Sequence, residues 1–411
     1  MTPAHHTPHI RLTQPAITRR QFVLAAATAA VSGLQGCVPA VSNRTSVAAT
    51  SGSTHLRLIG EARLPSALQF QGTTVGGLSG IDYNPETGLY YLLSDDGSGR
   101  NPARFYTARL PFDAHGIGEP EITGMTPLRR QDGSAYPGVI RSAGGGEVVD
   151  PESIRWRAAS QTLLWTSEGN TLTGSAPSLN ESRADGVLLR RFVLPPMFDL
   201  DPSQGPRNNL SFEGLTITPD GKTAWVSMEA SMLQDGPVPT VQAPGGPCRL
   251  TQFDVASGQV LRQVAYIPDA IPRAPQLPST RADNGISEIL MLDNHRMLVL
   301  ERAYMGGYDT ARGNSLRLYV VDTRQASNTL DLPTLQGAAF EPLRKTLLAD
   351  FASFVGPGAG KRLDRLDNTE GMTWGPQLPG GNRSLVFISD DNFNSMQITQ
   401  LLVFEFLGDT P

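Results

Sequence analysis

Acidic residues in this sequence recur in pairs with similar spacing. Glu152 and Glu168 are 16 residues apart, and so are Glu213 and Glu229. The other pairs, one of which begins with a serine, are Ser79 with Asp95, Glu288 with Glu301, and Glu370 with Asp390. Carboxylates that gather in one place bind hard cations such as Ca²⁺ and also act as general acids or bases. The pairs therefore predict a metal-binding or acid–base site, provided that the fold brings them together.

Each pair encloses the same short sequence pattern. In residues 211–230, SFEGLTITPDGKTAWVSMEA, two β-forming runs flank the turn PDGK. The pattern occurs five times, and its copies begin at Leu78, Pro151, Ser211, Ile286 and Thr369. Alternating apolar runs joined by polar turn residues are typical of β-hairpins. Because an antiparallel hairpin places the start of one strand beside the end of the other, both acids of a pair are expected at the same end.

Five copies of a hairpin along one chain predict a repeat architecture. The many glycines (42) and prolines (32), with few helical periodicities, favour an all-β fold of short strands. We therefore predict a β-propeller with five blades by repeat count. A degenerate sixth blade and a β-sandwich are the alternatives. The N-terminal run 55–65 has no hairpin partner, and we expect it to join the C-terminal run 396–407 in the last blade and close the ring.

In a propeller the innermost strands face a central channel, so the repeated acids are expected at one channel mouth. Carboxylates this close repel one another unless cations compensate, and Ca²⁺ is the cation that we expect. The predicted metal ligands are Asp95, Asp96, Glu152, Glu168, Glu213, Glu229, Glu288, Glu301, Glu370, Asp390 and Asp391. Two alternatives stay open: ion pairing with the nearby Arg155 and Arg302, or a structural role in which each acid accepts backbone N–H bonds.

Charge and motifs exclude several other function classes. The formal net charge is −5, and removing residues 1–37, which hold three arginines and no acid, changes it to −5 − 3 = −8. Nucleic acid is therefore not an expected partner. The sequence has no Gly-x-Ser-x-Gly motif, and its glycine-rich stretches do not lead into a helical pattern. Only Cys248 lies beyond residue 37, which excludes a disulfide framework and a thiolate metal site.

The N-terminus has the order of an export signal. Paired arginines at Arg19 and Arg20 precede an apolar stretch, and LQGC follows, ending at Cys37. The arginines resemble a twin-arginine signal, and LQGC resembles a bacterial lipobox whose cysteine becomes lipidated. We expect a signal at 1–37, a flexible tether at 38–54 and a folded domain at 55–411. The expected product is a periplasmic or outer-membrane lipoprotein, monomeric and membrane-bound only through Cys37. A transmembrane anchor is the alternative, although the apolar run of about 13 residues is short for one.

The five motifs together resemble a known family. GLSGIDYNPETGLYYLLSDDG, DPESIRW, NLSFEGLTITPDGKTAWVSMEAS, GISEILML and NTEGMTWGP occur in the order expected for the phytase-like family described as "esterase-like activity of phytase". The resemblance covers about residues 60–405. It implies hydrolysis of phosphate or other esters. Propeller phytases are calcium-dependent and six-bladed, and the five-copy repeat departs from that pattern.

Two functional hypotheses follow. The first is a metal-dependent hydrolase of small-molecule esters, most simply phosphoesters. In it the acids hold Ca²⁺, Glu213 or Glu229 acts as general base, and Arg155 or Arg302 contacts the phosphate. The second is a propeller at the cell envelope that binds a ligand or partner at the same mouth without turnover, because a fold by itself does not determine a function.

Overall fold

The structure is a computed structural model that describes residues 55–138, 147–277, 280–308, 313–357 and 363–408. The predicted signal and tether, residues 1–54, lie outside the described residues. Within the described residues no helix is both long and apolar enough to cross a membrane. Regular structure there consists of β-strands and four short 3₁₀ turns: η2 (Thr171–Thr173), η3 (Pro196–Phe198), η4 (Thr323–Gln325) and η5 (Phe351–Phe354).

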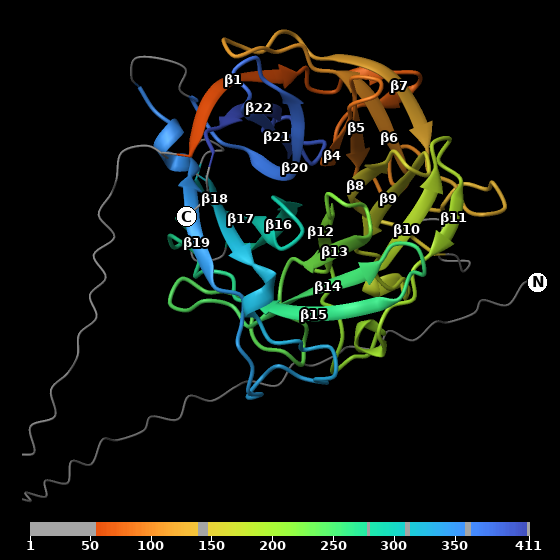
Figure 1. Ribbon diagram of the computed structural model, residues 1–411, viewed down its shortest axis with the longest axis vertical. Coiled ribbons are helices and arrows are strands. Elements are labelled where there is room, and N and C mark those ends of the chain that lie inside the picture. Colours follow the sequence, from red (N-terminus) through yellow and green to blue (C-terminus); the bar gives the residue numbers. More distant parts are fainter. Residues whose placement is uncertain (1–54, 139–146, 278–279, 309–312, 358–362, 409–411) are drawn as a thin grey trace, which may run out of the picture. The chain divides into compact units, whose positions relative to one another are not determined.

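Five four-stranded antiparallel sheets form the blades of a β-propeller (Figure 1). The first blade contains β4 (Leu78–Asn84), β5 (Leu89–Ser94), β6 (Arg104–Arg109) and β7 (Glu121–Pro127). The second contains β8 (Pro151–Arg157), β9 (Thr162–Ser167), β10 (Ser178–Arg183) and β11 (Leu188–Arg191). The third contains β12 (Phe212–Ile217), β13 (Thr223–Met228), β14 (Cys248–Asp254) and β15 (Val260–Tyr266). The fourth contains β16 (Ala282–Met291), β17 (Arg296–Met305), β18 (Asn314–Asp322) and β19 (Lys345–Asp350).

The fifth blade joins the two ends of the described chain. It contains β20 (Asn368–Gln377), β21 (Arg383–Asp390), β22 (Thr399–Phe406) and the N-terminal strand β1 (Leu56–Leu64). Strand β1 pairs antiparallel with β22, with Leu56 opposite Phe406 and Leu64 opposite Thr399. This pairing fastens the ring with backbone hydrogen bonds. The predicted five-bladed propeller and its closure by the N-terminal strand are confirmed. A two-stranded ribbon, β2 (Gln69–Phe70) with β3 (Thr73–Thr74), precedes the first blade.

The hydrophobic core lies between neighbouring blades. Alternate residues of each strand face the adjoining sheet, and the buried apolar side chains form clusters between neighbouring blades. Trp165 and Trp225 are buried in these clusters, at 0% and 1% exposure. Phe351, Phe387 and Phe404 pack edge to face between the fourth and fifth blades. The packed clusters hold the inner strands β4, β8, β12, β16 and β20 toward the centre of the ring (Figure 1).

Every inner strand carries a β-bulge near its start. The bulges lie between Leu78 and Gly80, Pro151 and Ile154, Phe212 and Leu215, Ile286 and Glu288, and Thr369 and Gly371. A bulge redirects the side chain of the extra residue. Glycine allows close approach at three of these bulges, at Gly80, Gly214 and Gly371. A Cβ at Gly214 would lie 2.7 Å from the Ile289 nitrogen, and one at Gly371 would lie 2.7 Å from the Ser79 carbonyl oxygen. The inner strands therefore crowd together directly beside the bulged residues.

Candidate functional site

A small acidic cavity lies where the bulged ends of the inner strands meet. Its volume is about 100 Å³. Eight of its lining residues are acids: Asp95, Asp150, Glu152, Glu168, Glu213, Glu229, Glu370 and Asp390. They come from four of the five blades, at the start of an inner strand or just after the end of the strand beside it. The structure thus brings together seven of the predicted ligands with one acid, Asp150, that was not predicted.

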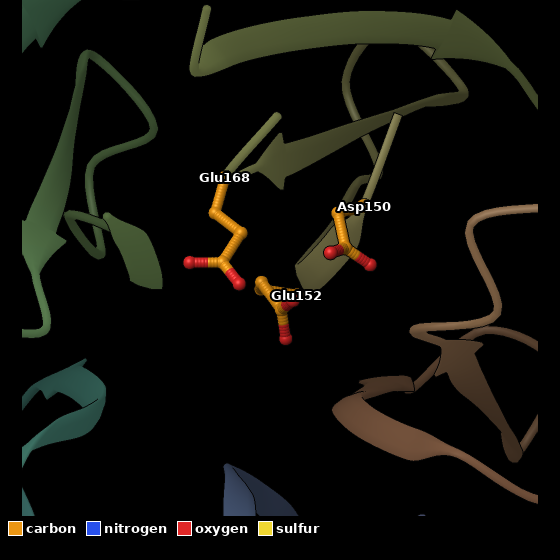
Figure 2. Close-up of side chains that lie close together, drawn as sticks. All are labelled: Asp150, Glu152 and Glu168. Atoms are coloured by element: carbon orange, nitrogen blue, oxygen red, sulfur yellow. The ribbon is translucent and has the colours of Figure 1, made fainter. Parts of the chain in front are cut away.

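The second blade supplies the tightest group of carboxylates. Asp150 and Glu152 lie at the start of β8, and Glu168 directly follows β9 (Figure 2). One carboxylate oxygen from each of the three can be chosen so that all lie within 4.8 Å of one another. The N–H of Glu168 donates to the carbonyl of Asp150, which fixes the two backbones side by side. Three convergent oxygens on a rigid hairpin are a suitable beginning for a hard-cation site.

Burial and mutual repulsion favour the protonated forms of these acids. Burial, with the charges of Asp96 and Glu370, raises the pKa of Asp150 to about 7. Burial also raises the pKa of Glu229 to about 7, against the opposing effect of Arg302. The pKa is raised well above the ordinary value, chiefly by burial and next by neighbouring acids, in Asp95, Glu152, Glu168, Glu213 and Asp390. Positive charge in the cavity would therefore be strongly favoured.

Two arginines line the cavity, and each already forms ion pairs with acidic residues. Arg302 lies 3.3 Å from Glu229, 3.4 Å from Glu370 and 3.3 Å from Asp283. Arg281 lies 2.7 Å from Asp283 and is largely exposed. Two guanidinium groups cannot balance eight carboxyl groups and Asp283. The Nε of Arg302 is buried and has no hydrogen-bond partner among the described residues.

The predicted places of Glu288 and Glu301 in the acid ring are wrong. In the fourth blade Ile286 is paired with Glu301, so the bulged residue at the start of the inner strand is Ser287 and not Glu288. The place that an acid occupies at the end of the second strand in the other blades is taken here by Arg302, the residue after Glu301. The other blades show the equivalent arrangement, because Phe212 is paired with Met228 and Glu229 follows. An apolar residue two positions after the bulged residue recurs in all copies: Ile81, Ile154, Leu215, Ile289 and Met372. Aligning the five copies on that apolar residue would have shown that Ser287, and not Glu288, is the equivalent of Glu152, Glu213 and Glu370.

Glu288 lies deeper in the channel and pairs with Arg155. Its Oε2 is 2.8 Å from Nη2 of Arg155, and its Oε1 accepts the N–H of Leu215 on β12. At the position of Glu288 the other blades carry the small residues Gly80, Ser153, Gly214 and Gly371. The small side chains leave room for one carboxylate at the centre.

Arg155 lies on the same axis and not at the acidic mouth. Its guanidinium donates to carbonyl oxygens on four inner strands, those of Ile81, Ile154, Ile289 and Met372. Arg155 also lines a pocket of about 640 Å³ formed by the opposite ends of the inner strands. The predicted contact of Arg155 with substrate phosphate at the acidic mouth is therefore wrong, because Arg155 does not line the acidic cavity and its Nη atoms bond to backbone carbonyls and to Glu288.

Glu301 points away from the channel into the fourth blade. Its carboxylate accepts from the Tyr266 hydroxyl at 2.6 Å, from Nζ of Lys345 at 2.6 Å and from Nδ2 of Asn284 at 2.8 Å. Glu301 is 1% exposed. A buried carboxylate with three donors is satisfied within the protein, so Glu301 is a structural ion-pair residue.

The second acids in two copies also have structural partners. Asp96 accepts three backbone N–H bonds from residues 99–101 and pairs with Arg104 at 2.8 Å. Asp391 accepts the N–H of Gly77 at 3.0 Å and so links the fifth blade to the first. Neither acid lines the cavity. For these two residues the structure matches the alternative in which the acid holds the backbone.

Sequence reasoning missed several residues of the mouth: Asp150, Asn209, Arg281 and Asn392. Asp150 had a usable signal, because it lies two residues before Glu152 and residues at i and i+2 of an extended chain point to the same side. Asn209 and Asn392 have positive φ angles, 54° and 47°, and lie in loops outside the paired strands. Their approach depends on loop conformation, which the alternation of side chains in the strands does not predict.

Comparison with known proteins identifies the family. The family model for phytase-like proteins, described as esterase-like activity of phytase, matches residues 73–393. The chain belongs to this phytase-like family. The match spans all five inner strands, and it contains every acid of the cavity. The description points to a hydrolase-type propeller. A search of curated proteins found no significant match.

Solved structures resemble the phytase-like chain only distantly. The hydrazine synthase of Kuenenia stuttgartiensis has 13% identity and a TM-score of 0.34, with 79% of this chain and 80% of that chain covered. The Dos1 propeller has 7% identity and a TM-score of 0.32, with 87% and 96% covered. The periplasmic gluconolactonase PpgL of Pseudomonas aeruginosa has 15% identity and a TM-score of 0.31, with 82% and 88% covered.

The acidic cavity of the phytase-like chain fits a hard cation by its donor chemistry. All its acids offer oxygen ligands, which Ca²⁺ prefers, and no histidine or cysteine lines the cavity among the described residues. Burial disfavours the ionised acids until positive charge is added. Asp150, Glu152 and Glu168 are the residues best placed to hold an ion.

Proposed function

We propose that this phytase-like protein is a Ca²⁺-dependent ester hydrolase that acts on phosphoesters at the acidic mouth of its channel. The observation that carries the proposal is the convergence of eight carboxyl groups on one small cavity beside Arg302. Purely structural acids would each need local donors, as Glu301 and Asp96 have. Some cavity acids also have such donors, as Glu168 has in the N–H of Ser211 and Asp390 in the N–H of Asn392, but all eight line one shared space.

Asp150, Glu152 and Glu168 would hold the cation. When bound, Ca²⁺ supplies positive charge that neutralises the acids and polarises an ester oxygen. Arg302 would orient the substrate, because it lines the cavity and a guanidinium group is a matching donor for an anionic oxygen. The ion pairs of Arg302 with Glu229 and Glu370 hold the guanidinium in position for this contact.

Glu229 and Glu213 are the candidates for proton transfer. Arg302 lies against Glu229 and favours its ionised form, so Glu229 is suited to accept the proton of the attacking water. Burial and the charges of Glu229 and Glu168 raise the pKa of Glu213 well above its ordinary range, so Glu213 is suited to donate a proton. The water oxygen forms a bond to the ester centre, the bond to the alcohol breaks, and the alcohol leaves with the proton from Glu213.

Ester hydrolysis by the purified protein tests the proposal. The substrates are p-nitrophenyl phosphate, phytate and p-nitrophenyl acetate, each with EDTA and with added Ca²⁺. We expect turnover of a phosphoester that EDTA abolishes and Ca²⁺ restores. Glu229→Gln and Glu213→Gln should each lower kcat by about 10²–10⁴-fold, whereas the exposed Glu119→Gln serves as the matched control.

Each negative result has a definite meaning. If no ester is hydrolysed, the hydrolase proposal fails and a binding propeller takes its place. If EDTA leaves turnover unchanged, the calcium requirement fails. If either glutamine substitution leaves kcat unchanged, that residue has no part in proton transfer.

We also propose export of the protein to the bacterial envelope. The support is sequence alone: twin arginines, an apolar stretch and the lipobox-like LQGC ending at Cys37. Lipidation of Cys37 would place a monomeric propeller at the membrane through its tether, where a small-molecule ester could diffuse to the open mouth.

A further inference from the structure

A larger pocket opens directly beside the acidic cavity. Its volume is about 560 Å³, against about 100 Å³ for the cavity. The two share the lining residues Asn209, Arg281, Arg302, Glu370 and Asn392. A substrate whose ester group enters the cavity would therefore place the rest of its structure in this pocket, which we call the amide pocket.

The amide pocket is lined mainly by neutral polar groups. Six of its residues carry carboxamides: Asn209, Asn314, Asn368, Asn392, Asn394 and Gln397. A carboxamide both donates and accepts hydrogen bonds, as a hydroxyl group does. Tyr304, Tyr308 and Met396 add apolar surface. This combination suits a compact molecule with many hydroxyl groups and apolar C–H faces.

The formal charge of the amide pocket is balanced. Its cations are Arg281 and Arg302, and its acids are Asp283 and Glu370. Arg281 is paired with Asp283 at 2.7 Å, and Arg302 lies 3.4 Å from Glu370. A ligand with many phosphates would find no unpaired cation in the lining to compensate its charge. A ligand with one esterified group needs such compensation only in the cavity, where the cation would bind.

A buried acceptor without a donor indicates where a hydroxyl group binds. Asn314 begins β18 opposite Tyr304 of β17 and is only 7% exposed. Its Oδ1 has no hydrogen-bond partner among the described residues. A buried acceptor left without a donor costs about 1–3 kcal/mol. Asn314 and Arg302 both line the amide pocket, and each carries one polar atom without a partner among the described residues. A hydroxyl can satisfy the first, and an ester oxygen can satisfy the second.

We propose that the amide pocket binds the neutral polyhydroxylated part, a sugar or polyol, of a substrate that carries a single ester group. The inference deepens the proposed function and rests on it only for the hydrolysis of that ester. It assigns Asn314 as a residue that determines specificity. It also predicts that a monoester of a sugar is preferred over a polyol that carries many phosphates.

Two measurements test the inference. The first compares kcat/KM for glucose 6-phosphate, p-nitrophenyl phosphate and phytate at equal free Ca²⁺. Glucose 6-phosphate should exceed phytate by at least tenfold. In Asn314→Leu the ratio of kcat/KM for glucose 6-phosphate to that for p-nitrophenyl phosphate should fall about tenfold, as expected for one lost hydrogen bond and a buried polar group left unpaired. Gln336→Ala, an exposed carboxamide that lines neither site, is the control.

The second measurement is binding of methyl glucoside, which has no ester, by ligand-observed NMR. We expect binding to the native protein and at least fivefold weaker binding to Asn314→Leu. Tyr304→Ala, which changes a partly exposed side chain, replaces Asn314→Leu if that variant does not fold.

The outcomes separate the two proposals. If methyl glucoside binds but no ester is hydrolysed, the proposed function is wrong and the pocket inference is supported. If esters are hydrolysed but phytate is the preferred substrate, the pocket inference is wrong and the hydrolase proposal stands. The same conclusion follows if the ratio of kcat/KM for glucose 6-phosphate to that for p-nitrophenyl phosphate is unchanged in both pocket variants and methyl glucoside does not bind.

Discussion

Arg155 and Glu288 form a buried ion pair on the axis of the propeller, with Nη2 of the arginine 2.8 Å from Oε2 of the glutamate. Between them the two side chains bond to backbone groups of all five inner strands. The pair lies between the acidic mouth and the pocket at the opposite end of the strands. It therefore joins the five inner strands between the two ends of the channel.

Removing one member of this pair should destabilise the propeller strongly. Glu288→Gln leaves a buried guanidinium without its counter-charge, and Arg155→Met leaves a buried carboxylate. Each should lower the free energy of unfolding by about 3–5 kcal/mol, measured by urea denaturation. Arg183→Ala, which breaks an exposed pair with Asp185, should change it by less than about 1 kcal/mol. The combined variant Arg155→Met with Glu288→Gln should cost less than the sum of the single changes, and strict additivity would show that the residues are not coupled.

Calcium should stabilise the folded protein measurably. A cation that binds the native cavity and not the unfolded chain adds about 2.7 kcal/mol when its concentration is 100 times its Kd. We expect the melting temperature to rise with added Ca²⁺ and to fall with EDTA. Asp150→Asn and Glu152→Gln should reduce that rise, because each removes a ligand charge from the tightest oxygen group. Glu119→Gln should not. An equal response in all variants would place the ion elsewhere.

The stability of the calcium-free protein should decrease as the pH rises through the range from about 4 to 7. Burial raises the pKa of Asp150 and Glu229 to about 7 in the folded state. In the unfolded chain these groups lose their protons near pH 4. Between these values the folded state holds more protons, so deprotonation favours unfolding and the stabilisation present at low pH is lost. Urea denaturation at pH 4.5, 6 and 7.5 with EDTA measures the slope. Asp150→Asn should flatten it, and a stability that increases over this range would contradict the sign.

Cys37 should decide where the protein is found in the cell. In a bacterial host the full chain should incorporate labelled fatty acid and sediment with membranes, because the lipobox-like sequence presents Cys37 for modification. Cys37→Ser should lose the label and move to the soluble fraction, whereas Cys248→Ser should retain both properties, since Cys248 is buried in the propeller. A Cys37→Ser protein that still sediments would favour a transmembrane anchor.

The hairpin repeat in the sequence predicted most of the fold and part of the candidate site. Its five copies give five blades, since each copy supplies the inner pair of strands. The ring closure followed from the unpaired N-terminal strand. Register in the fourth blade was mispredicted because Ser287 and Glu288 are adjacent, and a shift of one residue turns a side chain to a different face. Asn314 of the amide pocket belongs to an outer strand, and the repeated acids did not point to it.

By itself, the sequence determined that a hairpin recurs five times with an acid near the same end of each copy, because strand pairing is local and follows from the alternation of side chains. Only the tertiary structure decided which acids share a cavity. Bulges and neighbouring blades redirect Glu288 to Arg155 and Glu301 to Lys345, while Glu152 and Glu213 stay at the mouth. The physical reason is that a buried carboxylate takes whichever donors the folded backbone brings within reach. Those donors come from strands that are far apart in the chain.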